Sequence, residues 1–352
     1  MTTPSHAKSR RQFIASASAL VAAQLVMPSS NDASSKTLGI AFTSFPIRIR
    51  QTPQSAEKFI ELCRNFGADG CQMDIARLTS NDPDYLKGIR ALLEQKGMFL
   101  ELAVSAKMLG DPQGLSAAAA TATQLGVSRL RTAMLSGRRY EDFAEMPKWE
   151  EFVATSQTII KQAEPVLRKH QLLLGIENHK DWLVDDLVDL LRRTSSQFVG
   201  ACVDFGNNLA LLEDSLDVAR KLAPYAVTTH LKDMAVQRYD QGFELSEVPL
   251  GEGVVPLSQI IDVLRKGRSD IHFCLEMITR DPLKVPYKDD RYWSTFGKRD
   301  LTRIDKFERS ILTRTSSKPL PVISGLDTRG MLDTEDENVR RSMAYAKKTL
   351  GL

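Results

Sequence analysis

The sequence predicts an α/β fold, namely a (β/α)8 TIM barrel formed by a single domain with a C-terminal extension. Eight short apolar runs alternate with longer amphipathic segments from Thr37 onward, which is the pattern of strand and helix pairs around a parallel sheet. Most of these runs begin about 30 residues apart, which is the length of one strand, one helix and two loops. The last four runs end in carboxylate or imidazole side chains, as expected for an active site on the carboxyl face of a barrel.

The eight predicted strands are short, as expected of strands that are buried on both faces of a parallel sheet. They cover residues 37–45, 69–75, 98–104, 128–134, 172–178, 198–204, 226–232 and 270–277. The segments between them carry apolar residues at helical spacing, so we predict helices whose stripes face the barrel. These helices cover residues 55–65, 83–96, 114–125, 149–169, 184–194, 214–222 and 256–265.

Two connections are longer than the others and are predicted to line a substrate pocket. They lie near 137–150, after the fourth strand, and near 235–253, after the seventh. Both follow strands directly, and such βα loops emerge at the carboxyl face of a barrel. The barrel domain is expected to span 37–281. No Gly/Ser-rich linker separates residues 282–352 from it, so this extension, with a last helix around 335–350, is predicted to pack on the barrel.

The amino terminus resembles a twin-arginine export signal. Arg10 and Arg11 precede Phe13 and Ile14, and residues 15–27 are small or apolar but too few for a confident membrane span. Residues 1–36 are therefore predicted to be a signal peptide and a short linker. The resemblance implies that the twin-arginine translocase exports the folded protein to the periplasm, and no stable membrane span is expected in the mature chain.

The charge balance favours a small-molecule substrate. The chain of 352 residues has a formal net charge of +3, but without residues 1–36 it holds 43 basic and 43 acidic residues. Nucleic-acid binding requires a clustered basic surface, so no nucleic-acid partner is expected. The four cysteines show no CxxC spacing and mostly lie in apolar runs, which predicts buried, unbridged thiols.

Four residues at the ends of the last four strands are predicted to bind one divalent metal ion. They are Glu177, Asp204, His230 and Glu276. A carboxylate or imidazole in a buried strand is costly unless it is paired or coordinated, and four in consecutive strands of the barrel require a common explanation. Three carboxylates with one imidazole suit Mn²⁺, Mg²⁺, Co²⁺ or Zn²⁺.

This order of ligands resembles the xylose isomerase-like TIM-barrel superfamily, especially its sugar phosphate isomerase/epimerase branch. Further similarity lies in the segments His230-Leu231-Lys232-Asp233 and Gly251-Glu252-Gly253. The resemblance implies that Glu177 and Glu276 are a general acid/base pair as well as metal ligands. Asp204 and His230 would then act mainly as ligands.

Four further polar residues near these strand ends are predicted to contact substrate, each with a structural alternative. Asn178 and Asn207 could orient ligands or substrate hydroxyls, or could be ordinary turn and cap residues. His179 and Lys232 could contact a substrate oxygen or transfer a proton, or could be solvated loop ends. Lys232 belongs to the HxKD pattern of the resemblance.

The predicted reaction is isomerisation or epimerisation of an unphosphorylated sugar through a metal-stabilised enediolate. A lyase or hydratase acting on a 3-keto-glycoside would use the same proton abstraction, and a non-catalytic sugar-binding barrel is the alternative from another class. DNA-repair endonucleases of this superfamily hold three zinc ions, and the five histidines of this chain are too few for that site. The sequence leaves the sugar open, and a homo-oligomer is compatible with it.

Overall fold

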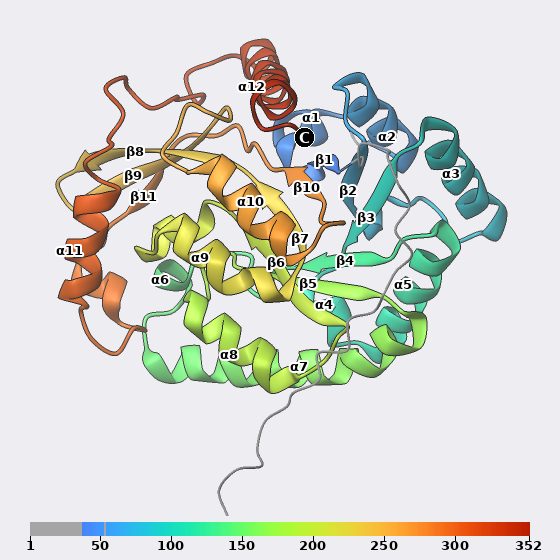
Figure 1. Ribbon diagram of the computed structural model, residues 1–352, viewed down its shortest axis with the longest axis horizontal. Helices are drawn as coiled ribbons and strands as arrows, with labels where there is room; N and C mark the ends of the chain where they lie inside the picture. The colour runs from blue at the N-terminus through green and yellow to red at the C-terminus, as the bar shows by residue number, and fades with distance from the viewer. Residues whose placement is uncertain (1–36, 53) are drawn as a thin grey trace, which may run out of the picture. The chain divides into compact units, whose positions relative to one another are not determined.

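Eight parallel strands close into a barrel in the order β1–β10–β7–β6–β5–β4–β3–β2 (Figure 1). The computed structural model describes residues 37–52 and 54–352. All eight predicted strands are present, and the barrel closes where Gly39 of β1 pairs with Cys274 of β10. The strands are β1 Leu38–Ala41, β2 Gly70–Asp74, β3 Phe99–Ala103, β4 Arg129–Thr132, β5 Leu173–Glu177, β6 Val199–Asp204, β7 Ala226–Leu231 and β10 Phe273–Leu275.

Two glycines make room for an aromatic ring at the amino-terminal end of the barrel. A Cβ atom on Gly70 would lie 2.3 Å from the Phe99 ring, and one on Gly39 would lie 2.8 Å from it. The ring of His272, which directly precedes β10, stacks on Phe99 with 3.7 Å between centroids. These rings fill the end of the barrel opposite the predicted site.

The seven predicted helices are all present, and local capping explains where several of them begin and end. Asp82, Asp111 and Asp214 accept hydrogen bonds from backbone N–H groups of the first turns of their helices, and Gly97 adopts the left-handed conformation that ends α3. The helices are α2 Ala56–Asn65, α3 Pro83–Lys96, α5 Pro112–Leu125, α7 Met146–His170, α8 Val184–Thr194, α9 Ser215–Leu222 and α10 Leu257–Gly267.

The two long connections leave β4 and β7, as predicted, but the second is a β-hairpin and not a loop. The first contains the short helix α6, Arg139–Asp142. The second forms strands β8, Asp233–Tyr239, and β9, Gly242–Val248, which pair antiparallel. The edge strand β11, Leu283–Val285, joins β9 to complete a separate three-stranded sheet.

A tight turn fixes this hairpin to the end of β7. The Asp233 carboxylate accepts hydrogen bonds from the N–H groups of Gly251 and Gly253, both 2.9 Å, and from that of Val255, 3.1 Å. Gly251 has a φ of +87°, and a Cβ on Gly253 would lie 2.2 Å from Asp233 Oδ1. The segments 230–233 and 251–253, which carry the family resemblance, therefore form one structural unit in which Asp233 holds the turn.

The C-terminal segment packs on the barrel through its last helix. This segment includes α11, Leu301–Ser310, and α12, Thr328–Thr349, which begins earlier than predicted because Asp327 caps it. Glu335 of α12 accepts hydrogen bonds from the N–H groups of Ile47, 2.7 Å, and Arg48, 3.0 Å, in α1, Pro46–Gln51. Helices α1 and α12 accordingly lie side by side in Figure 1.

The predicted export signal, residues 1–36, lies outside the described residues. Within those residues no helix is long and apolar enough to cross a bilayer. Cys63, Cys71, Cys202 and Cys274 are all buried and unbridged, which confirms the expectation from their spacing.

Candidate metal centre

The structure brings the four predicted ligands together at the carboxyl ends of neighbouring strands. Glu177 and Asp204 end β5 and β6, His230 is the penultimate residue of β7, and Glu276 directly follows β10. Each is no more than 2% exposed. One ligand atom from each of the four lies within 4.8 Å of the others, which is the spacing of groups that share one ion.

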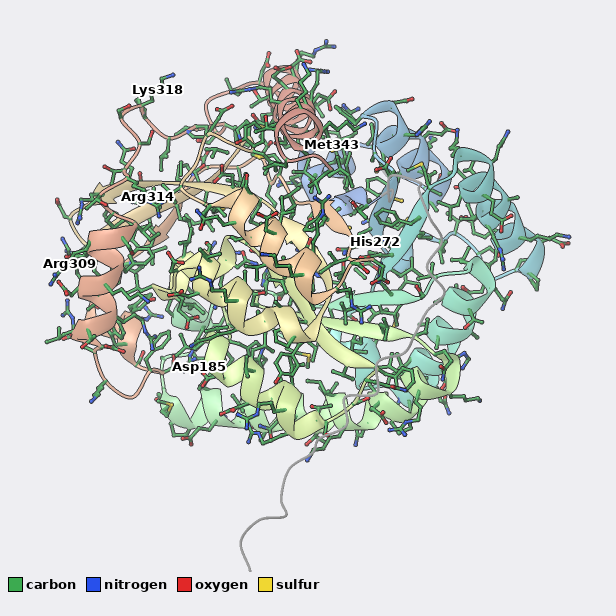
Figure 2. The ribbon with its side chains drawn as sticks, viewed as in Figure 1. Asp185, His272, Arg309, Arg314, Lys318 and Met343 are labelled. Atoms are coloured by element: carbon green, nitrogen blue, oxygen red, sulfur yellow. The ribbon has the colours of Figure 1, made fainter. Side chains whose placement is uncertain are left out.

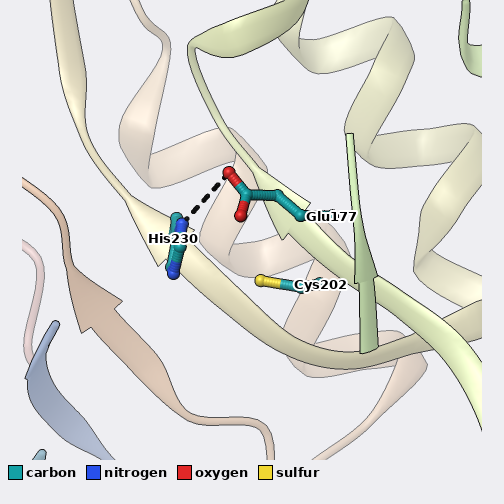
Figure 3. A group of neighbouring side chains, drawn as sticks. All are labelled: Glu177, Cys202 and His230. Atoms are coloured by element: carbon teal, nitrogen blue, oxygen red, sulfur yellow. Dashed lines mark ion pairs between the residues drawn. The ribbon is translucent and has the colours of Figure 1, made fainter. Parts of the chain in front are cut away.

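The imidazole of His230 faces the three carboxylates with one nitrogen. Its Nδ1 lies 3.3 Å from Glu177 Oε1, 3.4 Å from Glu276 Oε2 and 3.7 Å from Asp204 Oδ2. In Figure 3 a dashed line marks the contact with Glu177. Within residues 37–52 and 54–352, no group completes a hydrogen bond to this buried nitrogen. The other nitrogen, Nε2, lies 2.7 Å from Gln72 Oε1.

These atoms fit a divalent cation. A buried imidazole nitrogen without a hydrogen bond needs an explanation, and a metal ion supplies one. Among the described residues, Asp204 Oδ2 also has no hydrogen bond of good geometry, although the Lys232 ammonium lies 2.9 Å away. Carboxylate oxygens with one imidazole nitrogen are ligands that Mg²⁺, Mn²⁺, Co²⁺ and Zn²⁺ accept.

A second group of possible ligands replaces the acids Asp204 and Glu276 with Cys202 (Figure 3). The thiol lies on β6, where Cys202 is the register partner of Glu177. Burial raises the pKa of the Cys202 thiol to about 11, and only a thiolate binds metal well. The four-residue group is therefore the better site for a hard cation.

Two cations beside the cluster balance its negative charge. The Lys232 ammonium forms ion pairs with Asp204 and Glu276, and the Arg131 guanidinium pairs with Glu177 Oε2. Burial alone would raise the pKa of Glu276, but His230 and Lys232 hold it well below its usual range. Burial alone would lower the pKa of His230, yet Glu276 and its neighbours raise it to about 9. The carboxylates thus strongly favour a positive charge at this point.

The two asparagines orient ligand residues. Asn178 accepts a hydrogen bond from the Asp204 N–H, 2.8 Å, and donates to the Asp204 carbonyl, 2.9 Å, and to Asn208, 2.8 Å. These bonds use the donors of its amide, so Asn178 holds the end of β6 and has no N–H left for a substrate. Asn207 donates to Glu177 Oε1, 2.9 Å, and its backbone N–H donates to Asp204 Oδ1, 2.7 Å.

The predicted substrate residues His179 and Lys232 lie on the same side of the barrel as the cluster. Lys232 contacts it directly, whereas His179 is half-buried and places Nδ1 2.9 Å from the Leu135 carbonyl in the loop after β4. Burial, assisted by Lys180 and Arg131, holds the pKa of His179 well below its usual range. A neutral His179 ring donates from Nδ1 and leaves Nε2 as an acceptor.

Two groups at the site were not predicted from the sequence. Arg131 is a charged residue inside the apolar run 128–134, where the cost of burial could have identified it. Lys180 is 3% exposed and donates from Nζ to Asn207 Oδ1 at 2.5 Å. It lies in the loop after β5, and a lysine in a loop is usually exposed, so the sequence does not indicate that it is buried.

A closed barrel of eight parallel strands with helices between them is a (β/α)8 TIM barrel, and here four acidic or imidazole side chains meet at its strand ends. Residues 60–295 match the Xylose isomerase-like TIM barrel family, and the chain belongs to that family. Among individual proteins, it is similar to the 3-oxo-isoapionate decarboxylase of Pectobacterium atrosepticum. The two are 24% identical over 230 residues, which are 65% of this chain and 75% of the relative.

Solved structures share the fold at low sequence identity. The D-psicose 3-epimerase of Clostridium cellulolyticum H10, solved with D-tagatose, is 15% identical with a TM-score of 0.58, covering 89% of this chain and 99% of that one. A xylose isomerase-like TIM barrel protein from Mycobacterium smegmatis, in complex with magnesium, is 16% identical with a TM-score of 0.52, covering 78% and 97%.

Proposed function

We propose that this chain is a divalent-metal-dependent sugar isomerase or epimerase that moves a proton at a carbon next to a carbonyl group. The observation that carries the proposal is that His230 Nδ1 faces three buried carboxylates without a hydrogen bond to any described residue. Glu177, Asp204, His230 and Glu276 would hold the ion. A bound divalent cation would polarise the substrate carbonyl and stabilise the negative charge that develops as the proton leaves.

The position of the two glutamates supports an acid/base pair. Glu177 comes from β5 and Glu276 follows β10, with β6 and β7 between them in the barrel. Their carboxylates therefore approach His230 from different sides. Glu276 is held in the ionised form that a base requires, and Thr43 fixes its other oxygen by a 2.7 Å hydrogen bond. One glutamate would remove the proton and the other would return it, which gives epimerisation or isomerisation.

Hydrogen-bonding side chains beside the cluster support a hydroxylated substrate. Lys180 and Lys232 both donate toward Asn207, and His179 offers a ring nitrogen. Such groups can bind hydroxyl or carbonyl oxygens and fix the reacting carbon relative to Glu177 and Glu276.

A lyase is the second candidate, and the decarboxylase relative favours including it in the same tests. Loss of carbon dioxide from a 3-oxo acid leaves the same kind of negative charge next to a carbonyl as loss of a proton. The partly buried Arg131 and the buried Lys180 could bind the carboxylate of such a substrate.

The proposal is tested by metal analysis followed by an exchange assay. Purified protein should contain about one divalent ion per chain. In deuterated water, a panel of keto-sugars, 3-keto-glycosides and 3-oxo sugar acids would be followed by NMR and mass spectrometry. Deuterium at the carbon next to the carbonyl is the expected result, whereas carbon dioxide release would support the lyase.

The variant Glu276→Gln keeps the size of the side chain and removes the base. Turnover of the substrate found in the screen should fall by roughly 10²-fold or more. Glu94→Gln, which changes an exposed glutamate on α3 paired with Arg90, should have no effect. Full activity of Glu276→Gln would show that this residue is not the base. Turnover by metal-free protein would show that the reaction does not need the ion.

We further propose that the mature enzyme works in the periplasm after twin-arginine export, on the basis of Arg10 and Arg11. Exchange of both residues for lysine removes the arginine pair and should retain the protein in the cytoplasm. Cell fractionation with an antibody would measure this, and unchanged export of the Arg10→Lys/Arg11→Lys variant would overturn the assignment.

A further inference from the structure

A row of polar side chains, buried except for its last member, runs through the barrel interior away from the metal centre. It starts at His230, whose Nε2 lies 2.7 Å from Gln72 Oε1. Gln72 Nε2 donates to Glu101 Oε2 at 3.0 Å, and Glu101 Oε1 lies 2.8 Å from His272 Nδ1. The row crosses β7, β2 and β3 and ends at His272, just before β10, labelled in Figure 2.

Glu101 is unusual because a completely buried carboxylate lies in the middle of the barrel. Its side chain is 0% exposed, and burial of a charge is costly unless donors surround it. Four donors do so: Gln72, His272, the Thr228 hydroxyl, which lies 2.7 Å from Glu101 Oε2, and the Cys274 thiol, a weaker donor 3.8 Å from the same oxygen. Burial alone would raise the pKa of Glu101, but His272 and the other neighbours lower it below its usual value. Glu101 is therefore an acceptor.

An acceptor at Glu101 sets the direction of every hydrogen bond in the row. Its carboxylate requires the N–H₂ side of the Gln72 amide, so the Gln72 carbonyl must face His230. That carbonyl accepts only if His230 Nε2 carries the proton. In the neutral ring, Nδ1 then keeps its lone pair, and this is the nitrogen that faces Glu177, Asp204 and Glu276.

We propose that Glu101, acting through Gln72, is a positioning residue that fixes the ring orientation and tautomer of His230 for metal binding. The inference rests on the metal centre of the proposed function and adds residues that bind neither metal nor substrate. Such outer partners of a histidine ligand typically change metal affinity 10- to 100-fold when they are replaced.

The test measures binding of Mn²⁺ to metal-free protein by calorimetry, which needs no substrate. Glu101→Gln has the same shape but lets the Gln72 amide turn either way, so Mn²⁺ affinity should fall about tenfold or more. Gln72→Met removes the acceptor of His230 Nε2 and leaves Glu101 with His272, Thr228 and Cys274 as donors. It should weaken Mn²⁺ binding to a similar extent.

The exchanged pair Gln72→Glu/Glu101→Gln separates the effect of hydrogen-bond direction from the effect of side-chain packing. The new carboxylate at position 72 accepts from His230, and the new amide at position 101 donates to it, so the direction of the row is restored. Mn²⁺ affinity should return to within a few-fold of the wild-type value. Glu335→Gln is the control, because this buried carboxylate of α12 accepts hydrogen bonds from Ile47 and Arg48 of α1 and lies outside the row. It should bind Mn²⁺ like wild type.

The outcomes are distinct. Unchanged Mn²⁺ affinity in both Glu101→Gln and Gln72→Met would overturn this inference and leave the proposed function standing. An exchanged pair that binds no better than Glu101→Gln, with the same melting temperature, would also overturn it. If the wild-type protein binds Mn²⁺ but turns over no sugar, the proposed function is wrong and the positioning role of Glu101 still stands. If the wild-type protein binds no Mn²⁺, both proposals are wrong.

Discussion

Lys180 combines two features that each cost stability. Its φ of +64° lies in the left-handed region, which is rare for residues other than glycine, asparagine and aspartate. Its ammonium is buried beside Asn207, and burial together with the Lys232 charge lowers its pKa to about 7. Strained and electrostatically unfavourable residues of this kind concentrate at functional sites, which supports a role for Lys180 in substrate binding.

Replacement of Lys180 by methionine should therefore stabilise the protein and impair it as an enzyme. The folded-state pKa lies below the unfolded value, so unfolding takes up a proton between about pH 7 and 10, and wild-type stability rises with pH in that window. Below pH 7 Lys180 is charged in both states, so the full cost of burying its ammonium remains. Lys180→Met should thus gain roughly 2 kcal/mol at pH 6 and progressively less toward pH 10.

Urea unfolding at several pH values measures the gain, and the exchange assay measures turnover, which should fall about tenfold or more. Lys87→Met, at an exposed lysine on α3, is the control for loss of a positive charge and should change neither quantity by much. Lower stability together with full activity in Lys180→Met would assign the lysine a structural role.

At the scale of the elements, the turn that holds the β8–β9 hairpin should not tolerate a side chain at Gly253. A Cβ on Gly253 would lie 2.2 Å from Asp233 Oδ1 and 2.3 Å from the Met234 carbonyl, which is backbone and cannot move aside cheaply. Gly253→Ala should destabilise the protein by about 2 kcal/mol or more, measured by urea unfolding.

The matched control is Gly88→Ala. Gly88 lies in the interior of α3, and a Cβ there would meet nothing within 4 Å. Alanine should stabilise this helix by about 0.5–1 kcal/mol. Equal effects of the two substitutions would contradict the close approach of Asp233 to the turn.

The elements that the sequence could predict are those specified locally. Barrel strands are buried on both faces and helices have capping residues, so both could be recognised one segment at a time. The edge strand β11 could not be recognised in this way, because it begins 35 residues after β9 ends and, within the described residues, pairs with β9 alone. Pairing between distant segments leaves no periodic signal in either of them.

The candidate site was predicted by the cost of burying charge in a strand, and the same reasoning applies to residues that were overlooked. Glu101 and Gln72 lie in the third and second predicted strands, where polar side chains interrupt apolar runs. Both lie at the centre of a strand, and a polar residue there does not point to a site built at the carboxyl ends of the strands. Lys180 differs from them, since only the folded chain brings a lysine of that loop next to Asn207 and Lys232.

At the scale of the whole molecule, one glutamate joins the first and last helices of the described chain. Glu335 accepts hydrogen bonds from two backbone N–H groups of α1, and Arg48 of that helix pairs with Asp336 at 2.6 Å. The first turn of a helix leaves N–H groups unpaired, so α12 supplies a cap that α1 lacks in its own sequence.

Glu335→Ala should remove this cap and lower the free energy of unfolding by about 2 kcal/mol, with a fall in melting temperature of about 5 °C. Asp333→Ala removes an exposed carboxylate on the same helix, whose ion pair in the described part of the chain is with the exposed Arg329, and it should cost less than about 0.5 kcal/mol. Calorimetric melting of the two variants measures both values. Similar melting temperatures would contradict the capping role.

The contact between α1 and α12 also bears on how the protein is made. Ribosomes release the chain from its amino terminus, so β1 and α1 emerge long before their partners β10 and α12 have been synthesised. The nascent polypeptide must keep its first strand unpaired on one edge until translation is nearly complete. An unpaired strand edge favours aggregation, so chaperones that shield β1 during that interval are expected to raise the yield of folded protein.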